Sequence, residues 1–270
     1  MTVPAIEAHV NYLAATGERP VSYTFEPPPG IPPFSGRRDA RAVRIRDARS
    51  LAEHPTLDRE GFARVDHATA VRDFDDDAQV RGTYYAEVEA LLRRETGAVR
   101  VVIFDHTLRS TSPERRAEKQ AREPVRSVHN DYTAISGRRR VTDHLDPVEA
   151  AERLCRRHAV INVWRSIRGE IEEVPLAVCD ARSIAPADLV PTDLVYPDRI
   201  GEVYSVRYSP EHRWFYYPRL RSDEALLIKT YDSLEDGTAR FSAHTAFDDP
   251  TTPAVAAPRE SIEVRALVFF

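Results

Sequence analysis

The stretch Val128-His129-Asn130-Asp131-Tyr132-Thr133 places a histidine and an aspartate two positions apart. Residues two apart in an extended strand point to the same side, so the imidazole of His129 and the carboxylate of Asp131 are expected to face one point in space. A divalent iron that activates dioxygen is commonly held on one face by two histidines and one carboxylate, which leaves its other face open. The pair therefore predicts a third ligand far downstream, and His244 supplies it within the alternating, strand-like residues 241–247.

A second His-x-Asp pair, His144-Leu145-Asp146, has a structural explanation. Asp146 is followed by Pro147 and Glu149, which is the pattern of an N-cap, a first-turn proline and a capping-box acid at the start of a helix. We therefore interpret His144 as a loop residue before a helix and exclude it from the metal site.

The C-terminal part of the chain adds an anion-binding signal. Arg259-Glu260-Ser261 lies fifteen residues after His244, and strand alternation puts Arg259 and Ser261 on one side. A guanidinium group can bind a carboxylate bidentately, and a neighbouring hydroxyl can add a third hydrogen bond. This pair suits the distal carboxylate of 2-oxoglutarate.

The composition excludes several classes of partner. The net charge of -5 and the pI near 6.0 give no reason to expect nucleic acid or an anionic membrane surface. No apolar stretch approaches a membrane-spanning length, and the first residues lack the regions of a signal peptide. Two cysteines, Cys155 and Cys179, are expected to stay reduced in the cytoplasm. A small molecule is the expected partner, and the sequence leaves monomer and homodimer open.

We expect a single domain over residues 1–270, with residues 1–98 as an N-terminal arm and helical elaboration and residues 99–270 as the core. Apolar spacing predicts a helix over residues 78–96, and another is expected from Pro147 to about His158. The charged residues 109–124 are interpreted as a solvated, mobile connection. Many short expected strands separated by turn signals predict a mainly β fold with flanking helices, either a sandwich or a jelly roll. The expected strands are residues 100–106, 160–164, 176–179, 203–208, 213–217, 225–231, 240–247 and 261–270.

Five segments along the chain form an ordered set: HNDYT (129–133), NVWR (162–165), KTYDS (229–233), HTAFDDP (244–250) and RESIEVR (259–265). In this order they resemble the nonheme Fe(II)/2-oxoglutarate-dependent oxygenases of the cephamycin-type hydroxylase and gibberellin-type desaturase family. The resemblance runs from about residue 101 to the C-terminus and extends more weakly into the preceding residues. Five ordered motifs are far more specific than a single His-x-Asp pair.

The resemblance implies a double-stranded β-helix, the jelly roll of cupin-like proteins, and an oxidoreductase that uses Fe(II), 2-oxoglutarate and O2. It implies that His129, Asp131 and His244 bind the iron, with no catalytic residue beyond these ligands. The implied reaction of this dioxygenase is hydroxylation or desaturation of a small secondary metabolite, with release of succinate and CO2. The substrate stays open, as does the choice among hydroxylation, desaturation and ring formation.

The resemblance also assigns the anchor of the cosubstrate to Arg259 with Ser261. The connection over residues 248–258 is longer than in related oxygenases, so Arg265 is a rival anchor. Lys229 and Tyr204 lie on strands expected to line the barrel, where each is a candidate contact of the cosubstrate or a structural residue.

Aromatic strand residues provide candidates for a substrate wall, and Trp164 and Trp214 are the two we select, with core packing as the alternative. Asn162 is expected either to form a hydrogen bond near the metal or to have a structural role in which it links backbone segments by hydrogen bonds. Two other functions stay open. A cupin-like metal enzyme without 2-oxoglutarate would need no specific role for Arg259, and a noncatalytic β-sandwich binding protein would need no metal.

Overall fold

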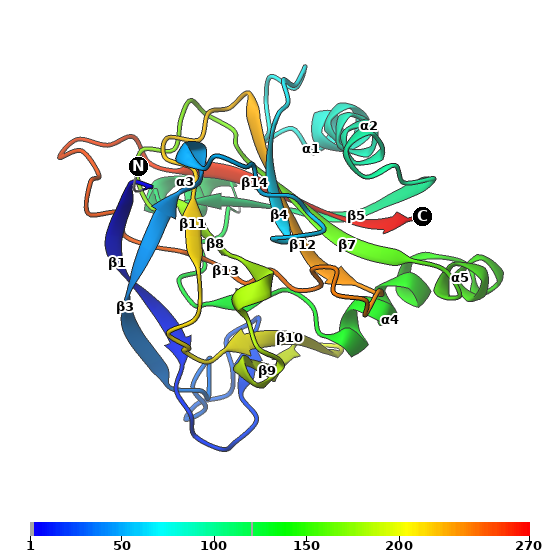
Figure 1. Ribbon diagram of the computed structural model, residues 1–270, viewed down its shortest axis with the longest axis horizontal. Coiled ribbons are helices and arrows are strands. Elements are labelled where there is room, and N and C mark those ends of the chain that lie inside the picture. Colours follow the sequence, from blue (N-terminus) through cyan, green and yellow to red (C-terminus); the bar gives the residue numbers. More distant parts are fainter. Residues whose placement is uncertain (1–2, 120) are drawn as a thin grey trace.

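Two β-sheets pack face to face in the computed structural model of the chain, which describes residues 3–119 and 121–270 (Figure 1). In spatial order the larger sheet contains β1 (Ala5–Leu13), β3 (Arg38–Asp47), β11 (Trp214–Tyr216), β8 (Leu176–Cys179), β13 (His244–Ala246), β6 (His129–Asn130), β10 (Ile200–Val206), β9 (Leu189–Val195) and β2 (Val21–Tyr23). The smaller sheet contains β4 (Phe62–Asp66), β12 (Glu224–Asp232), β7 (His158–Ser166), β14 (Glu260–Phe269) and β5 (Arg100–Ser110).

Helices cover the outer face and one end of this pair of sheets (Figure 1). They are α1 (Asp77–Gln79), a π-helical turn (Val80–Tyr84), α2 (Tyr85–Thr96), α3 (Pro113–Lys119), α4 (Ala134–His144) and α5 (Pro147–Leu154), with short 3-10 turns at Ala48–Ser50, Ala181–Ser183 and Pro186–Asp188. Within the described residues, no helix combines the length and the apolar character that crossing a membrane requires.

Strand β7 shows how the chain separates a core face from a site face. All of its residues are buried, because both faces of the smaller sheet are covered. Ile161 and Val163 pack on the outer face against α2, where Val88 and Leu91 are fully buried. Strand alternation then turns Asn162 and Trp164 toward the larger sheet. The residues between the two sheets are therefore the candidates for chemistry.

The predicted helix over residues 78–96 is confirmed as α1, the π-helical turn and α2, and it ends where Gly97 adopts a left-handed conformation (φ 71°). The N-cap at Asp146 is confirmed, since its carboxylate accepts from the backbone N–H groups of Val148 and Glu149. Two boundaries were wrong. His144 is the last residue of α4 instead of a loop residue, and α5 ends at Leu154 because His158 already begins β7.

Two segments expected outside the core are built into it. The first 98 residues contribute β1 to β4, and β1 pairs with β3 along its whole length. Residues 109–124 are not simply a connection, since β5 continues to Ser110 and α3 follows. Arg115 fixes α3, because its guanidinium pairs with Asp75 at 2.6 Å and Glu260 at 3.0 Å.

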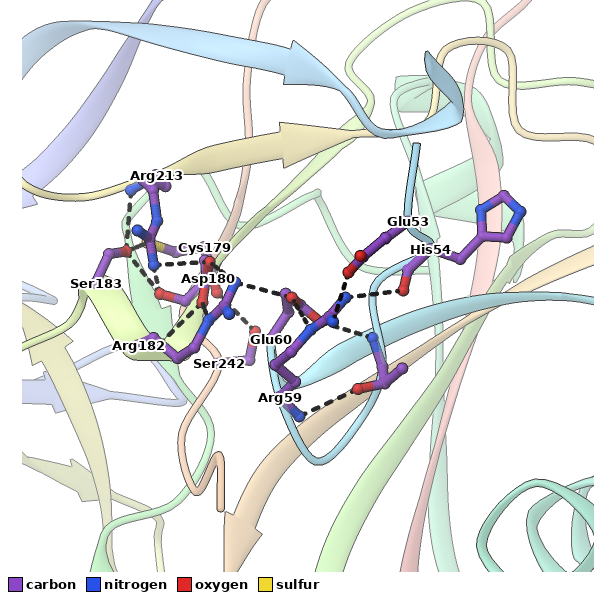
Figure 2. Close-up of polar contacts among 11 residues, drawn as sticks. Glu53, His54, Arg59, Glu60, Cys179, Asp180, Arg182, Ser183, Arg213 and Ser242 are labelled. Carbon is purple, nitrogen blue, oxygen red and sulfur yellow. Dashed lines mark hydrogen bonds and ion pairs between the residues drawn. The ribbon is translucent and has the colours of Figure 1, made fainter. Parts of the chain in front are cut away.

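A cluster of ion pairs joins the loop before β4, an edge strand of the smaller sheet, to the end of β8 in the larger sheet (Figure 2). Glu60 is 5% exposed and accepts hydrogen bonds from Arg59 at 2.6 Å and Arg182 at 2.8 Å. Asp180 is also buried and binds Arg182 and Arg213. Each buried acid is thereby paired, as a buried charge must be to avoid a large desolvation penalty.

Glu224 at the start of β12 provides a stability prediction. Its buried carboxylate accepts two hydrogen bonds from Arg49, at 2.8 and 2.7 Å, and one from Arg64. Burial alone would raise the pKa of Glu224, but the arginines outweigh burial and lower it to about 2. A depressed pKa contributes stability above the unfolded value of 4.5, and this contribution is lost as the pH falls toward 2.

We expect Glu224→Gln to lower the free energy of unfolding by about 2–3 kcal/mol at pH 7. Urea unfolding at pH 7 and pH 3.5 tests this, with Asp66→Asn as the control because Asp66 is an exposed partner of the same Arg64. The difference between wild type and Glu224→Gln should shrink clearly at pH 3.5. An equal difference at both pH values would contradict the prediction.

Candidate metal centre

Three predicted ligands come together between the sheets. His129 lies on β6, and Asp131 is the first residue after this strand. The antiparallel pairing of β6 with β13 sets His244 opposite His129. One ligand atom from each residue lies within 4.8 Å of the others. The Asp131 Oδ1 is 3.5 Å from His129 Nε2 and 3.9 Å from His244 Nε2. The convergence expected from alternation is therefore present in the geometry.

Backbone carbonyls select the same tautomer for both histidines. The Nδ1 of His129 is 2.8 Å from the carbonyl oxygen of Ser127, and the Nδ1 of His244 is 3.2 Å from that of Ser242. A carbonyl oxygen can only accept, so Nδ1 carries the hydrogen and donates it. Both Nε2 atoms are left as lone-pair donors that face Asp131, and a hydrogen-bonded Nδ1 is typical of histidines that bind a metal.

The charges of the triad are those that a divalent cation requires. Burial alone would raise the pKa of Asp131, but Arg265 and the two histidines hold it well below its usual value. Burial, and then the neighbouring His129, lowers the pKa of His244. At neutral pH the site therefore offers a carboxylate and a neutral imidazole without releasing protons from either. Two imidazoles and one carboxylate on one side fit Fe(II) with open positions.

The second oxygen of Asp131 faces away from the histidines. Its Oδ2 accepts hydrogen bonds from Asn162 Nδ2 at 2.8 Å and from Arg265 Nε at 3.0 Å. Asn162 and Arg265 are direct neighbours in the β7–β14 register. Of the two expectations for Asn162, the structure shows the hydrogen bond beside the triad.

The two candidate anchors of 2-oxoglutarate, Arg259 and Arg265, differ in whether their guanidinium groups already pair with carboxylates. The Arg265 guanidinium binds three acids, which are Asp131, Asp105 at 2.9 Å and Glu263 at 2.7 Å. Arg259 is 2% exposed, donates to the carbonyl of Val174 at 2.7 Å, and has no side-chain ion pair with a carboxylate among residues 3–119 and 121–270. Arg259 is thus the better receptor for an incoming carboxylate.

Arg259 also has the neighbours expected of an anion site. Its Nε lies 3.3 Å from Ser261 Oγ, and its guanidinium stacks 4.9 Å from the ring of Trp164. Burial, and then the nearby Arg109, lowers the pKa of Arg259 to about 9. A buried cation with this shift would be stabilised by an anion. Trp164 therefore lies beside the candidate cosubstrate anchor, on the inner face of the smaller sheet.

Arg109 is a site residue that the sequence analysis missed. It pairs with Ser261 across the β5–β14 register, and Thr107 and Asp105 continue the same row toward the triad. Its Nη1 donates to the carbonyl of Glu123 at 2.8 Å. The alternation of polar Asp105, Thr107 and Arg109 was the available signal, and ending the expected strand at residue 106 concealed it.

Lys229 is not brought to the triad. Its buried Nζ binds Asp58 at 2.5 Å and Asp232 at 2.8 Å, beside a cavity lined by Leu57 and Phe270. The next residue, Thr230, faces the site instead, with its Oγ1 3.4 Å from Asn162 Oδ1. Strand alternation therefore turns Lys229 to the opposite face of β12.

Tyr204 and Trp214 also lie on the faces opposite to the ligands. Tyr204 pairs with Asn130, whereas its neighbour Ser205 pairs with His129. Trp214 donates its indole N–H to Tyr12 at 2.7 Å in the core inside the curled larger sheet. Since residues directly opposite on neighbouring strands share a face, neither side chain points at the triad.

The chain is similar to known proteins over nearly its whole length. The family model described as "Oxidoreductase/YMDC permease-like domain" matches residues 10–269. Hydroxylase/desaturase CTB9 of Cercospora beticola is 38% identical over 255 residues, which cover 86% of this chain and 77% of that protein. Fe(II)/2-oxoglutarate-dependent dioxygenase nvfI of Aspergillus novofumigatus is 37% identical over 254 residues, with 92% and 90% covered.

A solved structure gives the same result for the fold. The iron and alpha-ketoglutarate-dependent endoperoxidase NvfI superposes with a TM-score of 0.89 at 33% identity, and the match covers 98% of each chain. This match confirms the expected mainly β, jelly-roll fold.

Proposed function

The chain belongs to the nonheme Fe(II)/2-oxoglutarate-dependent oxygenases of the hydroxylase/desaturase type, and from this premise we propose which residues bind the metal, the cosubstrate and the substrate. The family resemblance drawn from five motifs is thereby confirmed, and so is the oxidoreductase activity that it implied. The enzyme uses Fe(II), 2-oxoglutarate and O2 and acts in secondary metabolism.

We propose that His129, Asp131 and His244 hold Fe(II). One observation carries the proposal: two Nε2 atoms and one carboxylate oxygen converge within 4.8 Å, and both Nδ1 atoms are bound to carbonyls. When bound, Fe(II) supplies the activation of O2 that couples decarboxylation of 2-oxoglutarate to succinate and CO2 with oxidation of the substrate.

We propose that Arg259 and Ser261 bind the distal carboxylate of 2-oxoglutarate. The buried guanidinium, which forms no ion pair with a carboxylate in the described part of the chain, supports this assignment. Arg259 also directly precedes β14, the strand that carries Arg265 beside the triad. Binding a carboxylate there would offset the desolvation of Arg259 and orient the keto acid end toward the ligands. Trp164 forms the wall behind the guanidinium and excludes water from the pair.

The substrate is proposed to be a small secondary metabolite. We place its entry next to Asp105, because this side chain is 50% exposed and pairs with Arg265 beside the triad. A cytoplasmic location is proposed as well, because Cys155 and Cys179 are both free thiols in the structure.

Anaerobic titration of the metal-free protein with Fe(II) and then with 2-oxoglutarate tests the proposed function. We expect one Fe(II) per chain, and then the visible metal-to-ligand charge-transfer band of the chelated keto acid. Under air, added 2-oxoglutarate should yield succinate. Iron binding without the band would overturn the cosubstrate assignment and favour a metal enzyme without 2-oxoglutarate. Absence of iron binding would overturn the metal site.

A further inference from the structure

The two oxygens of Asp131 have different surroundings. Oδ1 is the atom nearest to the two histidine Nε2 atoms, and Oδ2 accepts from both Asn162 and Arg265. A carboxylate oxygen has two lone-pair directions, so two N–H donors use the accepting capacity of Oδ2. Oδ1 is the oxygen that stays available to a cation.

The Arg265 side chain is itself held in place. Its Nη2 donates to Glu263 at 2.7 Å, and its Nη1 donates to Asp105 at 2.9 Å and Thr107 at 3.3 Å. The β5–β14 register shifts between Arg265 and Ala266, and such a bulge redirects the side chain next to it. Contacts on the remaining nitrogens thus fix the Nε that reaches Asp131.

We propose that Arg265 is a positioning residue, which together with Asn162 holds Asp131 so that only Oδ1 binds the metal. This inference rests on the proposed function. A second bound oxygen would occupy one of the positions needed by the two keto acid oxygens and O2. Arg265 therefore acts on the metal through Asp131 and is not an anchor of 2-oxoglutarate.

The sign of the effect on metal affinity separates positioning from simple electrostatics. Removing a cation beside a bound divalent metal should strengthen metal binding, because a repulsive charge is lost. Removing a group that orients the ligand should weaken metal binding, and loss of such a contact typically costs 10–100-fold. Weaker binding is therefore opposite in sign to the effect of losing the repulsion between Arg265 and the metal ion.

The experiment measures Co(II) and Fe(II) affinity of the metal-free protein by competition with a chelator, together with the visible spectrum of the Co(II) form. We expect Arg265→Met to bind both metals 10–100-fold more weakly and to change the Co(II) spectrum, because Asp131 can rotate. Arg265→Lys keeps the charge without the guanidinium fork and should restore little of the affinity. Asn162→Leu should act in the same direction, and the double variant should lose less than the product of the two effects.

Two controls protect the conclusion against a folding defect. Arg265→Met removes the guanidinium that pairs with the buried Glu263, so the Glu263→Gln/Arg265→Met variant repeats the test with that acid neutralised. Arg157→Met removes a guanidinium that pairs with Asp58 and Asp232 instead of Asp131, and should leave metal affinity unchanged. Suppose that wild type binds one metal ion per chain. If Arg265→Met, alone and combined with Glu263→Gln, then binds the metal equally or more tightly and with an unchanged spectrum, the inference is overturned. If wild type itself binds no metal, the proposed function fails instead.

Discussion

His244→Ala should lower the affinity for Fe(II) by at least about 100-fold and abolish succinate formation from 2-oxoglutarate. The substitution removes one of the three proposed ligands, and loss of a contact that only orients a ligand already costs 10–100-fold in metal affinity. The side chain is 2% exposed and its Nε2 faces Asp131. Within the described residues, the group that could hold a metal contains no imidazole besides those of His129 and His244. Metal content after anaerobic loading, and the charge-transfer band with 2-oxoglutarate, measure the effect.

His158→Ala is the matched control for this experiment. His158 is equally buried, and its Nδ1 lies 2.9 Å from the carbonyl of Arg156, which is the same local geometry as that of His244. It lies on β7 beside Tyr231 and is not part of the triad. We expect full metal content in this variant. Equal metal loss in both variants would point to a general folding defect and contradict the assignment of His244.

Arg259→Leu should raise the 2-oxoglutarate concentration required for the charge-transfer band by about 100-fold. A charge-assisted, bidentate contact with a carboxylate contributes roughly 3 kcal/mol, which corresponds to this factor. The metal-free variant should be as stable as wild type or more stable. Burial lowers the pKa of Arg259, so its charged form is a cost to the folded state that leucine removes.

Lys229→Met gives the opposite pattern and serves as the control. Lys229 is also a buried cation, but Asp58 and Asp232 already pair with it. Its removal leaves Asp232 buried with one partner fewer, so we expect lower thermal stability and an unchanged 2-oxoglutarate requirement. If Lys229→Met raises that requirement and Arg259→Leu does not, the assignment of the cosubstrate anchor is reversed.

Local sequence was sufficient for features that depend on spacing along one strand or helix. The two-residue period predicted that His129 and Asp131 converge and that Arg259 lies with Ser261, and both pairs are found together. Cap signals located the start of α5, and apolar spacing located α2. These features are decided within a few residues by backbone geometry, so no knowledge of distant neighbours was needed.

Tertiary structure alone decided which face of each strand points toward the site and which charged side chains pair across the sheet. Alternation assigns residues to two faces but does not say which face is inside, and for this reason Lys229, Tyr204 and Trp214 were selected although they point elsewhere. The pairing of β7 with β14 brings Asn162 and Arg265 to one oxygen of Asp131, residues that are far apart in sequence. Strand register and long-range ion pairing arise only when the sheets assemble, so the sequence could predict the candidate ligands but not the side chains that hydrogen-bond to Asp131.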